Sequence, residues 1–217
     1  MKAKHRYGSR KLIHGCFIND FPDTIVDPKT GRAHWTYRKW QAIIDRWSKG
    51  LADVSEDWYS YTNFRRWLLE KFEIYGEYVE GKWAIDKDYL SDEGHKLYSP
   101  DTCVFIPEGL NSIRLLGVKY ACKNDLPHGV WYDKSTQKYR AQYHHKLTKK
   151  LVKRGGKKTA LESHQQWQHA TSDKLLYAIQ KYHYVDPRVL EQLECASLGI
   201  MCDLAQGVET KDIWYRC

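Results

Sequence analysis

Three features that many proteins carry are missing from this chain of 217 residues, and each absence excludes a class of protein. The sequence has no run of about 18 apolar residues, so it predicts no membrane-spanning helix. The first residues are basic, but no apolar stretch follows them, which argues against a secretory signal. The six cysteines include no C-x-x-C pair, the usual spacing of a structural zinc site. We therefore expect buried thiols in a protein of the reducing cytoplasm.

Aromatic residues are abundant and supply material for a core. Nine Trp and 16 Tyr contribute to an aromatic fraction of 14%. A chain of this length and composition is not typical of a disordered protein, and it can form one large domain or two small ones.

Positive charge is concentrated in one part of the chain. The net charge is +8, and residues 119–183 hold 14 Lys and Arg against 4 Asp and Glu. Residues 51–118 have the reverse balance, with 7 basic against 13 acidic side chains. Basic segments of this kind release counterions from nucleic-acid phosphates, and an acidic segment can hold a cation. The alternative is an unevenly charged surface with no such role.

The first half of the sequence predicts two helices and then a small mixed unit. Apolar side chains repeat with the helical period over residues 36–48 and again over residues 57–72. Residues 83–116 then read as strand, loop, strand and helix, with Pro107 ending the second strand and suiting the first turn of the helix.

Two oxygen-bearing side chains flank this small unit. Asp86 ends the first strand, and Asn111 lies on the helix. A carboxylate and an amide are ligands that Mg²⁺ or Mn²⁺ prefers, so the pair is a candidate metal site. On spacing alone, a solvated strand end and an exposed helix residue explain the pattern as well.

The same stretch resembles the degenerate HNH endonucleases of bacteriophages, which are homing-type nucleases. The matching segments are Ile85-Asp86-Lys87-Asp88, Tyr98-Ser99-Pro100-Asp101-Thr102-Cys103-Val104-Phe105-Ile106-Pro107 and Asn111. The resemblance implies a ββα-metal nuclease site that uses Mg²⁺ or Mn²⁺, with Asp86 and Asn111 as the metal ligands.

The candidate general base differs from the family pattern. HNH enzymes usually have a His after the strand-end Asp, whereas this chain has Lys87. A lysine acts as a base only if its pKa falls by several units. His95, in the loop between the strands, is the other candidate, because imidazole titrates near neutrality. Asp88, in the same strand end, completes the set of candidate catalytic residues.

The second half predicts a three-stranded sheet followed by helices. Residues 129–133, 138–143 and 149–153 are expected strands, and Thr159 is expected to cap a helix from Ala160 to about Lys181. Residues 184–217 are expected to be helical, with Pro187 at the start. This last segment could pack on the core or form a dimer face.

Residues 128–183 resemble the plant ethylene-response-factor (APETALA-type) DNA-binding domain. The matching residues are Gly129-Val130-Trp131-Tyr132, Tyr139-Arg140-Ala141, Gly155 and Thr159. The resemblance implies a sheet that lies in a groove of double-stranded DNA. It implies DNA contacts from Trp131, Lys138, Arg140, Lys146, Lys149, Lys150, Lys153 and Arg154.

Together these patterns predict an α+β protein with a helical scaffold, a ββα-metal unit and a three-stranded antiparallel sheet packed on a helix. The expected domains are residues 1–118, 119–183 and a tail at 184–217. The favoured function is a metal-dependent endonuclease of duplex DNA, phage-encoded and acting in the host cytoplasm as a monomer or homodimer. The alternatives are a catalytically inactive DNA-binding protein on the same scaffold and a phage protein that binds a host protein.

Overall fold

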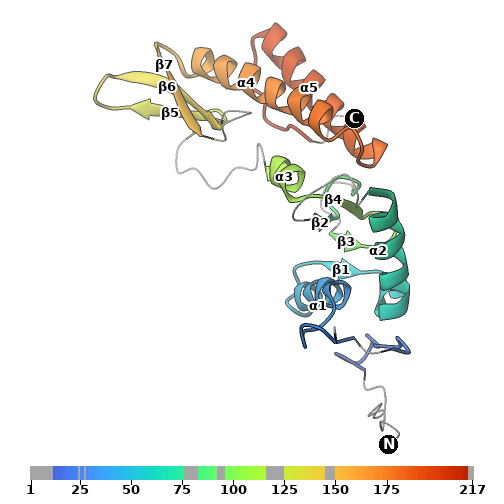
Figure 1. Cartoon of the computed structure of the whole chain (residues 1–217). Helices are drawn as coiled ribbons and strands as arrows, with labels where there is room; N and C mark the ends of the chain where they lie inside the picture. Colours follow the sequence, from blue (N-terminus) through green and yellow to red (C-terminus); the bar gives the residue numbers. More distant parts are fainter. Residues whose placement is uncertain are drawn as a thin grey trace, which may run out of the picture. The chain divides into compact units, whose positions relative to one another are not determined.

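The computed structural model describes residues 12–23, 25–26, 28–75, 83–91, 96–115, 125–144 and 150–214. The chain divides into two compact units, residues 1–105 and 106–217 (Figure 1). Helices and small sheets occur in both, so the predicted α+β class is confirmed. The division falls within β4, ahead of the domain boundary expected after residue 118, and the functional division into three domains stays a prediction.

An aromatic core holds the helices of the first unit together. Helix α1 spans Trp35–Ser48, and α2 spans Tyr61–Tyr75 after the 3-10 turn η1 at Glu56–Tyr59. Trp40 and Trp58 are both buried, and the Trp40 indole N–H donates to the Trp58 carbonyl at 2.8 Å. Phe64 packs edge-on against Trp58 with ring centroids 5.1 Å apart. The periodicity therefore predicted both helices, although Phe72, expected on the apolar side, is 42% exposed.

Four short strands form two pairs next to these helices. Strand β1 (Asp53–Val54) pairs in parallel with β3 (Leu97–Tyr98), and neither was expected from the sequence. Strand β2 (Trp83–Asp86) pairs with β4 (Val104–Pro107), which are the two strands expected in the ββα unit. Trp83 and Phe105 stack across this pair at 4.4 Å between ring centroids.

The helix of the expected ββα unit is short. Helix α3 spans Glu108–Asn111 and continues as the 3-10 turn η3 at Ser112–Leu115. Pro107 is the N-cap residue and provides no side-chain hydrogen bond to the helix. A proline at this position has a φ suited to a helix start, but it has no side-chain oxygen to cap the helix. This agrees with the short length of α3.

The second unit contains the predicted three-stranded antiparallel sheet, in the order β5-β6-β7. Strand β5 spans Val130–Asp133, β6 spans Lys138–His144 and β7 spans Leu151–Lys157. The third strand was expected to end before the glycine pair, but it continues through Gly155 and Gly156. Both glycines have positive φ, and the pairing shifts between Tyr139 and Arg140, so a bulge absorbs them. A Cβ at Gly155 would lie 2.9 Å from the Arg140 Cα, so only glycine fits there.

Two long helices back this sheet (Figure 1). Helix α4 spans Ala160–Lys181 and packs on the sheet, and α5 spans Pro187–Gln206 and packs on α4. Thr159 and Glu162 form a capping box, which confirms the predicted start of α4. Val189 and Leu193 are buried, so α5 belongs to the core of this unit. Leu198, expected at an apolar contact, is instead 66% exposed, because it faces away from α4.

A polar clasp joins the segment after α5 to α4 and to the approach of β5. The buried His164 ring accepts the Thr210 backbone N–H at Nε2, 3.0 Å away, and Nδ1 bonds the His128 carbonyl at 2.8 Å. The Gln168 amide donates to the Val208 carbonyl at 3.0 Å. Burial lowers the pKa of His164, so the ring stays neutral and keeps an acceptor for Thr210.

Two further expectations concern cysteines and membranes. Among the described residues, Cys103 is a buried free thiol, as expected, whereas the free thiols of Cys16 and Cys202 are half-buried and exposed. Cys195 is disulfide-bonded, which also corrects the expectation of buried thiols. Burial raises the pKa of Cys103 to about 12, so this thiol is inert. In the described part of the chain, no helix has the length and hydropathy of a membrane span.

Candidate functional site

Asp86 occupies the last position of β2 and is buried, with 6% of its surface exposed. Its Oδ1 accepts the backbone N–H of Asp88 at 2.8 Å and that of Tyr89 at 3.1 Å. The carboxylate therefore closes the turn that follows the strand. Burial, with the nearby Asp88 charge, raises the pKa of Asp86 even though these bonds act in the opposite direction. A bound cation would offset this cost, so the environment suits a metal ligand.

Lys87 makes contacts that a charged ammonium makes. Its Nζ pairs with Asp88 Oδ1 and lies 5.7 Å from the centroid of the Tyr98 ring. Only 7% of the Lys87 side chain is exposed, against 50% for Asp88. The Arg46 guanidinium adds a second cation by donating to the Tyr98 hydroxyl at 3.2 Å. These contacts favour a role in charge balance for Lys87, and its role as a base stays a prediction.

The Ser-Pro-x-Thr part of the matched motif closes the turn between β3 and β4. Ser99 Oγ accepts the Thr102 backbone N–H at 3.1 Å, and Thr102 Oγ1 donates to the Leu97 carbonyl at 2.7 Å. The Cys103 N–H donates to the Ser99 carbonyl at 3.1 Å. The hydroxyls thus have a structural role: they join the segment that holds Tyr98 to the strand that pairs with β2.

The other predicted members of the nuclease centre are only partly described. Asn111 ends α3 and is half-buried, but it belongs to the second unit while Asp86 belongs to the first. Their convergence on one cation therefore stays a prediction. His95 lies outside the described residues. Within the described ranges, no group of three or more His, Cys, Asp or Glu side chains is arranged to hold a metal ion.

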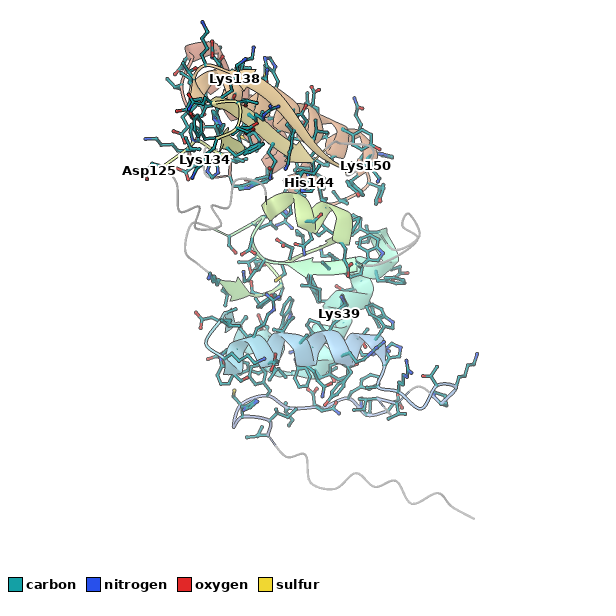
Figure 2. All side chains as sticks on the ribbon, turned by 90° about the vertical axis from the view of Figure 1, so that its left-hand side faces the viewer. Lys39, Asp125, Lys134, Lys138, His144 and Lys150 are labelled. Atoms are coloured by element: carbon teal, nitrogen blue, oxygen red, sulfur yellow. The ribbon has the colours of Figure 1, made fainter. Side chains whose placement is uncertain are left out.

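The sheet of the second unit presents one face away from its helices. Ala141 is fully buried on the side where α4 packs on β6, so alternation places its neighbours Arg140 and Gln142 on the opposite, open face. Lys138 and His144 follow the same alternation. Figure 2 looks onto the sheet from the side opposite α4 and α5 and labels Lys138 and His144 on it.

Cation and aromatic groups lie side by side on this open face. Trp131 of β5 is paired with Arg140 of β6, and Lys153 of β7 is paired with Gln142. The Lys153 ammonium lies 5.1 Å from the centroid of the Trp131 ring, so side chains of the two outer strands meet across β6. Three of the predicted DNA contacts, Trp131, Arg140 and Lys153, are thus brought together.

One residue of this face was missed by the sequence reasoning. Asp133, at the end of β5, accepts the Arg140 Nε–H at its Oδ2, 2.8 Å away. Its Oδ1 accepts the Ser135 N–H at 3.0 Å and the Ser135 hydroxyl at 2.6 Å. The Asp-Lys-Ser-Thr turn is a recognisable signal for such self-capping, but the bond to Arg140 depends on the strand register.

The other residues predicted to contact DNA lie at or near the start of β7, or outside the part of the chain that the structure describes. Lys150 is exposed immediately before β7. Arg154 pairs with Ala141 in the sheet, and its side chain is outside the described part. Lys146 and Lys149 also lie outside it.

No protein-family model, curated protein or solved structure matches this chain.

Proposed function

We propose that this protein is a metal-dependent endonuclease of double-stranded DNA. The observation that carries the proposal is the open face of the β5-β6-β7 sheet, where cationic and aromatic side chains meet on a rigid antiparallel support. The buried Asp86 at the end of β2 supplies the second part, because it is a carboxylate in need of a compensating cation.

The sheet would hold the duplex. Lys138 and Lys153 project from the open face and would bind phosphates, releasing counterions as they do so. Trp131, half-buried beside Lys153, would pack on a sugar or base. The excess of positive charge in residues 119–183 would steer DNA toward this face.

Residues of the predicted ββα-metal unit would supply the cutting chemistry. Asp86 and Asn111 would hold Mg²⁺ or Mn²⁺, and a donor set this small suits Mg²⁺, which usually keeps several waters. When bound, such a cation neutralises charge that develops on the scissile phosphate. His95 would accept the proton of the attacking water, or Lys87 would do so in a neutral form that has left its ion pair with Asp88.

A plasmid-nicking assay with Mg²⁺ or Mn²⁺ tests the proposal. We expect the wild type to nick supercoiled DNA, and we expect Asp86→Ala and Asn111→Ala to abolish nicking while DNA binding measured in EDTA is retained. Asp53→Ala and Asn63→Ala are matched controls, because they remove an exposed carboxylate and an exposed amide from the first unit. Failure of the wild type to bind duplex DNA at low salt would overturn the whole proposal.

A DNA-binding protein without catalysis is the second candidate. It is favoured by Lys87, which stands where the related nucleases usually have a histidine and is engaged by Asp88 and Tyr98. Salt-sensitive duplex binding together with no nicking in either metal would support this candidate over the endonuclease.

A further inference from the structure

Among the described residues, the Arg140 guanidinium is held through a hydrogen bond at one edge. Its Nε–H donates to Asp133 Oδ2 at 2.8 Å, and 29% of the Arg140 side chain is exposed. A bond at Nε restrains the plane of the guanidinium. It therefore also restrains the direction in which the two terminal nitrogens point within that plane. Bidentate recognition by arginine needs such a fixed plane.

Asp133 is itself fixed by the turn that follows β5. Both the N–H and the hydroxyl of Ser135 donate to its Oδ1, while Oδ2 accepts from Arg140. The hydrogen bonds of Ser135 and of the Thr136 side chain hold the pKa of Asp133 well below its usual range. The same hydrogen bonds fix the position of the carboxylate from which Oδ2 accepts the Arg140 Nε–H.

The cross-strand neighbours of Arg140 leave space for a ligand. On one side the partner is Trp131, whose ring is covered by the Lys153 ammonium at 5.1 Å. On the other side the partner is Gly155, which has no side chain. Glycine inside a strand often marks a place where another molecule approaches closely. Arg140 thus has the Trp131 ring on one side and a residue without a side chain, Gly155, on the other.

We infer that Asp133 is a positioning residue that makes Arg140 a reader of guanine in the major groove, while Lys138 and Lys153 contact phosphates. The inference rests on the proposed binding of duplex DNA. An arginine fork matches the O6 and N7 acceptors of guanine, and one good bidentate pair discriminates against a wrong base by roughly tenfold or more. A lysine, with a compact point charge, has no comparable fork.

The experiment selects bound sequences from a pool of duplexes with a randomised central segment, using the full chain in EDTA so that no DNA is cut. We expect the wild type to enrich sites with at least one fixed guanine. We expect Asp133→Asn to lose most of this preference, about tenfold, while its affinity for the unselected pool changes by less than about threefold. Asp125→Asn is the matched control, because it removes the same charge from the exposed segment before β5 (Figure 2).

A second variant separates positioning from a purely structural role. Arg140→Lys keeps the charge but removes the fork, and we expect the same loss of guanine preference as in Asp133→Asn. The double variant should be no worse than either single one, because both act on one contact. Melting temperatures of all variants show whether folding is preserved.

The outcomes distinguish the two levels of the argument. If the wild type binds no duplex, the proposed function fails. If it binds without base preference, or if Asp133→Asn keeps the wild-type preference, the assignment of Asp133 and Arg140 is overturned and the arginine is a phosphate contact. Equal loss of preference in Asp125→Asn would also overturn it, because the effect would then be one of net charge.

Discussion

Asp86 and Asp133 occupy equivalent local positions in the two units. Each ends a four-residue strand, each is followed by a lysine, and each accepts the backbone N–H two residues ahead, at 2.8 and 3.0 Å. Their pKa values nevertheless move in opposite directions. Burial raises that of Asp86, whereas the hydrogen bonds of Ser135 and its neighbours lower that of Asp133.

Burial outweighs the hydrogen bonds of the turn at Asp86, whereas the hydrogen bonds of the turn dominate at Asp133. Asp86 is buried, so its ionised form is unfavourable, and a bound cation would stabilise that form. Asp133 lies at the surface beside Arg140 and already has its cation. One site therefore suits an added metal ion, and the other suits the orientation of an arginine.

The largest expected effect is on cleavage by Asp86→Asn. This change keeps the shape and an acceptor for the turn but removes the charge that would hold a metal ion. We expect nicking to fall by at least about a hundredfold, since even supporting residues around a metal commonly cost 10- to 100-fold. A Mg²⁺-dependent rise in melting temperature should be present in the wild type and absent from the variant. Undiminished nicking would remove Asp86 from the centre.

The next effect concerns one lysine from each unit, Lys153 on the open face of the sheet and Lys87 beside Asp86. Lys153→Ala should weaken duplex binding several-fold near physiological salt and reduce the slope of log K against log salt by about one, as for one lost phosphate contact. Lys87→Ala should leave this slope unchanged, because Lys87 is buried against Tyr98 and Asp88. Binding titrations at four salt concentrations test both expectations. Equal slopes for the two variants would contradict the assignment of the sheet as the binding face.

Stability should respond to pH in opposite ways at the two sites. The folded-state pKa of Asp86 is above its unfolded value, so its ionisation costs stability as pH rises through that window. Without metal, Asp86→Asn should therefore melt at a higher temperature than the wild type at pH 7, and the gain should disappear at low pH.

Asp133 has the reverse sign. Its folded-state pKa is below the unfolded value, so its contribution is complete above the unfolded pKa and is lost as pH falls from there through the lower folded-state pKa. Asp133→Asn should melt lower than the wild type at pH 7, with the deficit shrinking as pH falls below the unfolded pKa. Calorimetry from pH 3 to 7 on both variants measures the two trends, and shifts of the same sign would contradict this account.

The smallest expected effect is that of Ser135→Ala. The change removes one of the two Ser135 bonds to Asp133 and keeps the backbone bond. If the lost hydrogen bond contributes about 0.5 kcal/mol to holding Asp133 in place, the guanine preference in the selection experiment should weaken roughly twofold. A loss as large as that of Asp133→Asn would mean that the hydroxyl, and not the carboxylate, orients the arginine.

Much of the fold could be predicted because its signals are local. Thr159 as an N-cap residue gave the start of α4, and the Asp186-Pro187 pair gave the start of α5. The two strands around the Asp133 turn were likewise expected at nearly their observed bounds. In each case neighbouring residues supply their own hydrogen-bond partners, so little tertiary information is needed.

What could not be predicted depends on contacts distant in sequence. The end of β7 was placed too early, because a glycine pair usually ends a strand unless a bulge absorbs it, as happens opposite Arg140. Leu198 was expected at an apolar contact, but it lies off the buried face of α5 formed by Val189, Leu193 and Ile200. The Asp133 bond to Arg140 depends on the strand register, which brings together residues of two strands.

The polar clasp after α5 limits which fragment of the chain can carry the folded sheet. His164 and Gln168 bind the backbone near Thr210, and His128 carries the chain from that clasp into β5. A fragment stopped at residue 183 would leave the buried His164 and Gln168 without these partners and uncover the side of α4 against which α5 packs. Fusions that use this sheet should therefore extend through Trp214, which is itself buried.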